Sequence, residues 1–177
     1  MKKIFLFLSC AAVVSLSSCG PKNNGNADAN VPQGMTAADL SEVSEQRMLV
    51  LVNVPDSTSG VLEITANSQG GADVKVGKNF QMTITEGAGN IDMKKQDITH
   101  DDVRKFVKYL VEDPNALVWE WQIEGMEPEF HFYSIVKAGD KTFEVRDVEG
   151  EVFSEKAAMQ MLDASKSIRM KEPKAES

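Results

Sequence analysis

Cysteine and histidine are nearly absent from this chain of 177 residues. It contains two cysteines, Cys10 and Cys19, and two histidines, His100 and His131. These are too few ligands for the zinc sites that cysteine and histidine usually build. They are also too few for the disulfide framework of a small secreted domain. We therefore expect no metal ion and no cofactor, and a fold held together by its hydrophobic core.

Positive charge is also scarce, because 19 Lys and Arg stand against 27 Asp and Glu, for a formal net charge of −8. Nucleic acids and anionic lipids attract clustered basic side chains. The composition therefore argues against a nucleic-acid partner. One basic cluster departs from this background and is either a docking surface for an acidic partner or a solvated face: Lys94, Lys95, Arg104, Lys105 and Lys108.

The longest apolar run, Ile4 to Val14, is shorter than the roughly 20 residues that a membrane-spanning helix needs. It follows Lys2 and Lys3 and precedes small and polar residues, which is the layout of a signal peptide over residues 1–18. The quartet Leu16-Ser17-Ser18-Cys19 resembles the lipobox of bacterial lipoproteins. That resemblance implies that Cys19 becomes the acylated first residue of the mature protein, which then meets the membrane through its N-terminal lipid.

The same resemblance implies a location in the cell envelope, and Gly20 after the cysteine, where some lipoproteins have aspartate, implies the outer membrane. The face of that membrane stays open. Residues 19–47 then form the lipidated cysteine, a flexible tether and a short helix, since GPKNNGNADANVPQG has almost no large apolar side chain to bury. We expect a single α+β domain over residues 48–168 and a polar tail over 169–177.

Turn residues and alternating apolar positions divide the first half of the domain into strands. Thr36 and Asp39 resemble a capping box and predict the short helix before the first strand. Gly70, Gly71 and Gly77 indicate hairpin turns, because no Gly-Lys-Ser/Thr follows them as in a phosphate-binding loop. The predicted strands span residues 48–54, 61–66, 73–76 and 80–86.

In the second half, apolar residues at helical spacing predict a helix opened by Thr99 and ended by Pro114. Strict alternation from Leu117 to Ile123 predicts a strand, and residues 129–137 and 141–147 follow it as two further strands. A last helix begins after Ser154. The sequence thus predicts an α+β fold in which an antiparallel sheet with a three-strand meander carries two packing helices.

Three segments, DDVRKFVKYLVEDP, EFHFYSIVKAGDKTFEV and EKAAMQMLDASKSI, together resemble the PsbP-like family of small α/β/α sandwiches. The third meander strand departs from the family, because it lacks the usual tyrosine-ended segment. The resemblance implies a binding or assembly factor that docks on a larger complex. It places no functional residue of the family on this sequence.

Four residues of the predicted aromatic hairpin are candidates for binding: Trp119, Trp121, His131 and Tyr133. Aromatic side chains of this density either form the core or line a pocket or interface. The glutamates at 120, 124, 127 and 129 lack the Asp-x-Asp-x-Asp-Gly spacing of a calcium loop, and no Gly-x-Ser-x-Gly elbow supports a serine hydrolase. The sequence favours a non-catalytic binding or assembly module over the alternative, a small-ligand receptor or hydrolase-type enzyme using a cleft beside this hairpin.

The lipobox resemblance predicts the chemistry of the mature N-terminus. Mass spectrometry of the protein isolated from membranes should find Cys19 as its first residue, carrying acyl chains. An unmodified Cys19 thiol, or a mature chain that still starts at Met1, would contradict the prediction.

Overall fold

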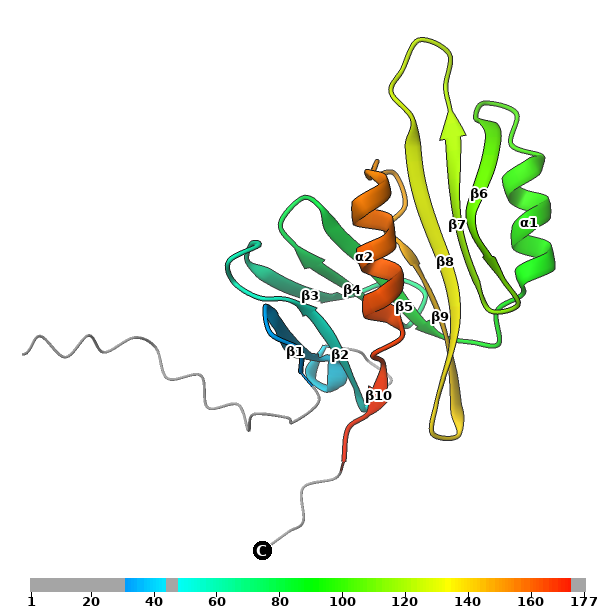
Figure 1. Ribbon diagram of the computed structural model, residues 1–177. Coiled ribbons are helices and arrows are strands. Elements are labelled where there is room, and N and C mark those ends of the chain that lie inside the picture. Colours follow the sequence, from blue (N-terminus) through cyan, green and yellow to red (C-terminus); the bar gives the residue numbers. More distant parts are fainter. Residues whose placement is uncertain (1–30, 44–47, 173–177) are drawn as a thin grey trace, which may run out of the picture.

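The computed structural model describes residues 31–43 and 48–172, so the predicted signal peptide and the acylated Cys19 lie outside the described residues. The described part contains ten strands, two α-helices and one short 3-10 helix (Figure 1). In chain order these are β1 (Met35–Asp39), η1 (Leu40–Glu42), β2 (Val50–Pro55), β3 (Leu62–Ala66), β4 (Ala72–Val76), β5 (Phe80–Glu86), α1 (Ile91–Thr99), β6 (Lys105–Asp113), β7 (Ala116–Gln122), β8 (Glu129–Ala138), β9 (Lys141–Asp147), α2 (Glu155–Ser165) and β10 (Arg169–Met170).

Seven strands form one antiparallel sheet in the order β3-β4-β5-β9-β8-β7-β6. The predicted antiparallel α+β fold is confirmed, and the three predicted meander strands are β7, β8 and β9, which are adjacent. The meander is part of a larger sheet than the sequence indicated, because β5 pairs with β9 and joins the first half of the chain to the second. A second sheet has three strands in the order β1-β2-β10.

The large sheet is covered on both faces, because side chains alternate along each strand. On one face Val118 of β7 and Phe132 of β8 share a core cluster with Met161 of α2 and with the apolar residues of β2. On the other face Trp119 and Trp121 pack with Ile98 of α1. Helices α1 and α2 therefore lie on opposite faces, and Figure 1 shows α1 beside β6 and α2 next to β8.

The helix predicted from Thr99 to Pro114 is wrong, because this segment forms the edge strand β6. Its pairing with β7 has two irregularities, one between Phe106 and Lys108 and one between Tyr109 and Val111. Each bulge adds a residue and shifts the alternation. As a result Phe106 and Tyr109, three residues apart, pack on the same cluster as α1, and the strand imitates the spacing of a helix.

Helix α1, which lies just before this strand, was not predicted from the sequence. Its N-cap is Asn90, whose side-chain oxygen accepts a hydrogen bond from the backbone N–H of Met93 at 2.9 Å. Only Ile91 and Ile98 of the helix are buried. Two apolar anchors in nine residues leave too weak a pattern for periodicity to detect.

Two further differences concern the ends of the described chain. The short helix expected near Thr36 is strand β1, and Asp39 caps the 3-10 helix η1 instead, accepting a hydrogen bond from the Ser41 N–H at 3.0 Å. Arg169 and Met170, assigned by sequence to the polar tail, pair with Leu51 and Val50 of β2. The folded region therefore begins earlier and ends later than residues 48–168. The N-cap Ser154 is confirmed, as its hydroxyl accepts from Ala157 N–H.

No helix among the described residues has the length and apolar character needed to cross a membrane.

The contact of α2 with the large sheet predicts a large penalty for truncating Leu162, which is 1% exposed in the main core. Leu162→Ala should lower the free energy of unfolding by about 2–5 kcal/mol, because it removes buried methyl groups and leaves a cavity. Urea denaturation measures this loss. Val61→Ala is the control, since Val61 is 75% exposed and should change stability by no more than about 0.5 kcal/mol. Equal effects at the two positions would contradict the assigned packing.

Candidate functional site

A pocket of about 140 Å³ lies on the face of the large sheet that α1 covers. Three of the four candidate residues from the sequence, Trp119, Trp121 and His131, line it, and Tyr133 does not. The pocket also collects residues from α1, from the turn before β6, and from β9 and the turn after it. The complete lining is Lys94, Arg104, Trp119, Trp121, His131, Phe132, Arg146, Asp147, Glu149 and Gly150.

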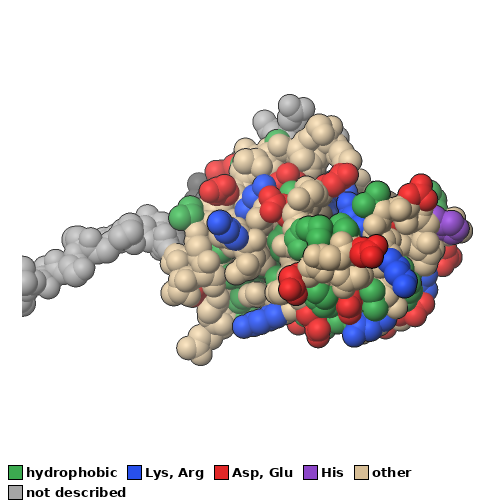
Figure 2. All heavy atoms as spheres, turned by 90° about the horizontal axis from the view of Figure 1, so that it is seen from above, with side chains coloured by type: hydrophobic (Ala, Val, Ile, Leu, Met, Phe, Trp, Pro, Cys, Tyr) green, Lys and Arg blue, Asp and Glu red, His purple; other side chains and the backbone are tan. Residues whose placement is uncertain are grey.

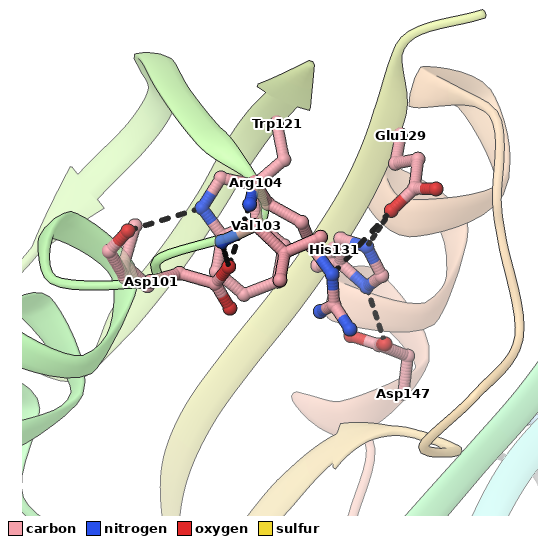
Figure 3. A network of polar contacts seen from close by, with 8 residues as sticks. Asp101, Val103, Arg104, Trp121, Glu129, His131 and Asp147 are labelled. Atoms are coloured by element: carbon pink, nitrogen blue, oxygen red, sulfur yellow. Dashed lines mark hydrogen bonds and ion pairs between the residues drawn. The ribbon is translucent and has the colours of Figure 1, made fainter. Parts of the chain in front are cut away.

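His131 and Asp147 form a buried pair at this pocket (Figure 3). His131 Nδ1 lies 2.7 Å from Asp147 Oδ2, and Asp147 Oδ1 accepts a hydrogen bond from the Phe132 backbone N–H at 2.8 Å. Both carboxylate oxygens therefore have partners. An ionised carboxylate only accepts, so the imidazole proton of a neutral His131 lies on Nδ1 and the free lone pair on Nε2.

A second carboxylate, Glu129, lies on the other side of the ring. Its Oε2 is 3.6 Å from His131 Nε2 and 4.0 Å from Arg104 Nε, and Glu129 is 5% exposed. Figure 3 shows His131 between the two carboxylates with Arg104 beside it. Buried charges are tolerated when they are paired. Acidic and basic side chains therefore alternate along this row, in the order Asp147, His131, Glu129 and Arg104, so that opposite charges are neighbours.

The turn before β6 places Arg104. Asp101 Oδ1 accepts hydrogen bonds from the backbone N–H groups of Val103 at 2.9 Å and of Arg104 at 2.6 Å. The hydrogen bond from Arg104 is the main reason that the pKa of Asp101 is lowered from its ordinary value. The turn directs the Arg104 guanidinium over the Trp121 ring, with its central carbon 4.7 Å from the ring centroid.

Aromatic rings form the rest of the pocket wall. The rings of Trp119 and His131 are stacked with centroids 5.7 Å apart, and Trp121 is tilted against His131 at 5.1 Å. Lys94 of α1 lies above this wall, with Nζ 5.4 Å from the Trp119 ring centroid and 5.7 Å from that of Tyr133. The site thus has one aromatic wall with the Lys94 ammonium group above it.

Two ring nitrogens in this wall are buried and have no hydrogen-bond partner among the described residues: Nε1 of Trp119 and Nε2 of His131. By contrast, Nε1 of Trp121 donates to the carbonyl oxygen of Ile98 at 3.1 Å. A buried polar atom without a partner costs about 1–3 kcal/mol. A ligand that supplied the missing hydrogen-bond partner would remove this cost.

Tyr133 has a structural role next to the pocket. Its hydroxyl donates to Glu144 Oε2 at 2.9 Å and accepts from the Asn90 N–H at 3.1 Å, which ties β8 to the start of α1. Burial raises the pKa of Tyr133 to about 12, and the hydrogen bond to Glu144 adds to the rise. The hydroxyl therefore remains a hydrogen-bond donor at neutral pH.

The other sequence candidates do not gather into a site. Glu120 lies 3.3 Å from Lys108 Nζ, and among residues 31–43 and 48–172 no three His, Cys, Asp or Glu side chains are placed to hold a metal ion. His100 is exposed at the end of α1. Sequence reasoning missed Asp147 and singled out Lys94 and Arg104 only as members of a basic cluster.

Comparison with protein-family models, curated proteins and solved structures found no match for this chain. The chemistry of the pocket is therefore the basis for assigning a function.

The buried Asp147–His131 pair makes a prediction about stability. Asp147→Ala should lower the free energy of unfolding by about 3–5 kcal/mol, because it leaves His131 and the Phe132 N–H without their buried partner. Glu149→Ala is the matched control two residues away. Its carboxylate is 87% exposed and pairs with Arg146 at 3.6 Å, so the loss should be at most about 1 kcal/mol. Chemical denaturation of both variants measures the difference, and similar losses would refute the buried pair.

Proposed function

We propose that this protein is a lipid-anchored, non-catalytic binding module of the cell envelope, and that it binds a small ligand in the pocket beside Trp119 and His131. One observation carries the choice of site. Trp119 and His131 both line this pocket, and their Nε1 and Nε2 atoms are buried without hydrogen-bond partners among the described residues. A ligand that pairs with both would remove two desolvation penalties at once.

Small-molecule sites combine apolar walls with convergent polar groups, and this pocket combines the Trp119 and Trp121 rings with charged side chains. Lys94 and Arg104 lie over its aromatic wall as long side chains that can move aside. On the face drawn in Figure 2, acidic and basic side chains are intermixed and hydrophobic ones form only small patches. Figure 2 shows no wide apolar patch among the described residues on that face.

The anchor is the part of the proposal that rests on the sequence. The lipobox-like quartet ending in Cys19 supports an acylated N-terminus, and the polar segment after it supports a tether that lets the domain stand off the membrane. The outer membrane is the proposed location. An envelope protein is the proposed further partner of the tethered domain.

The PsbP-like α/β/α sandwich belongs to the same proposal. Helices α1 and α2 on opposite faces of one sheet support it. The strand β6 counts against it, because DDVRKFVKYLVEDP contributed to the resemblance as a helix. Membership of that family would mean that the domain docks on a larger envelope complex, in addition to binding a small ligand in its pocket.

A hydrolase-type enzyme is the second candidate, and the Asp147–His131 pair favours it. Asp147 would orient the ring so that Nε2 acts as a general base toward water. The pocket lining contains no serine, threonine or cysteine to act as a nucleophile. Loss of a detected hydrolytic activity in His131→Ala would support the enzyme.

The binding proposal predicts that a benzene-sized compound enters the pocket. The test uses the full mature protein in detergent micelles, titrated separately with benzoate, benzamide, benzylamine and benzyl alcohol. The chain has two tryptophans, so its ¹⁵N NMR spectrum has two indole N–H signals. At least one compound should shift the Trp119 signal more than that of Trp121, because Trp121 Nε1 is already bonded to Ile98. If none of the four compounds moves the Trp119 signal, the proposed binding function is wrong.

A further inference from the structure

We infer that the ligand of this pocket is a small flat organic anion, a monocarboxylate about the size of benzoate, whose charge lies near Lys94 and the indole N–H of Trp119. The inference rests on the proposed binding function and names the chemical class of its ligand.

The donor at Trp119 sets the first requirement. An indole nitrogen can only donate a hydrogen bond, so the atom that pairs with Trp119 Nε1 must be an acceptor. His131 Nε2 makes no contrary demand, because an imidazole nitrogen accepts when the ring is neutral and donates when it is protonated. A carboxylate oxygen meets the requirement at Trp119 and accepts the stronger, charge-assisted bonds that cations donate.

Lys94 supplies the cation. Its contacts within the described part of the chain are with the Trp119 and Tyr133 rings, and none of the ion pairs found there includes it. The next residue, Lys95, differs, because its Nζ lies 2.7 Å from Glu112 Oε1. Lys94 is therefore a half-buried ammonium group above the pocket with capacity for an anion.

Each carboxylate around the pocket lies next to a basic side chain or a hydrogen-bond donor, which weakens its attraction for a cationic ligand. Asp147 uses both oxygens on His131 and Phe132 N–H, and Glu129 lies beside His131 and Arg104. Glu149 pairs with Arg146. The donors with spare capacity are the Trp119 indole N–H and the Lys94 ammonium group, and they favour an anion even though the whole chain is acidic.

Size and shape follow from the walls. A cavity of roughly 150 Å³ accommodates benzene in a protein interior, and this pocket has about 140 Å³. The rings of Trp119 and His131 lie side by side on one wall, stacked at 27° with centroids 5.7 Å apart. A flat ring with one carboxylate covers this aromatic wall better than a branched or extended acid does.

The experiment compares benzoate with benzamide, its neutral counterpart, on the intact mature protein by calorimetric titration and by the two indole signals. Benzoate should bind about tenfold more tightly than benzamide, because a hydrogen bond to a charged group is stronger than one between neutral groups. Lys94→Met keeps an unbranched apolar chain over the rings and removes the charge. It should weaken benzoate about tenfold and leave benzamide unchanged.

Lys95→Met is the matched control on the same helix, and it should leave benzoate binding unchanged, since Lys95 pairs with Glu112 and does not line this pocket. Thermal unfolding midpoints of both variants verify that they fold. Equal affinity for benzoate and benzamide, or equal losses in the two lysine variants, would overturn the inference. So would preferential binding of benzylamine, which would nevertheless leave the proposed binding function standing. If none of the compounds binds, both the inferred anion and the proposed binding function are wrong.

Discussion

The need to cover both faces of the seven-stranded sheet shapes the rest of this molecule. Strands β7 and β8 carry large apolar side chains on both sides, so neither face can be left in water. On one face α2 and the small sheet close over Val118 and Phe132 in the main core. On the other, α1 buries only Ile91 and Ile98 against the tryptophans. The pocket lies on this second, more thinly covered face.

Burial at this pocket also decides which polar groups gather there. A histidine and two carboxylates this close to the core require partners, and the structure supplies them in the alternating order Asp147, His131, Glu129, Arg104. His131 bonds Asp147 through Nδ1 only, and its Nε2 and the Trp119 Nε1 are pocket-residue atoms that are buried without hydrogen-bond partners among the described residues. The pairing that makes the buried charges tolerable thus leaves one indole donor and one imidazole nitrogen unpaired on residues that line the pocket.

Predictions from sequence were accurate for strands whose apolar and polar residues alternate without interruption. Strands β5 and β9 begin and end where alternation placed them, and Ser154 caps α2 as expected. The prediction failed at β6, where two bulges displaced the alternation and produced helical spacing between Phe106 and Tyr109. A bulge is stabilised by the partner strand and by the cluster that it packs on, neither of which is visible in a single segment.

By itself, the sequence determined the α+β class, the antiparallel hairpins and the aromatic strand face that holds Trp119, Trp121 and His131, because each follows from local alternation and turn residues. Tertiary structure alone decided that β5 joins β9, that α1 covers the aromatic face, and that Asp147 meets His131 across sixteen residues. These contacts depend on strand order and register, which are set by the simultaneous burial of many side chains and not by any one stretch of chain.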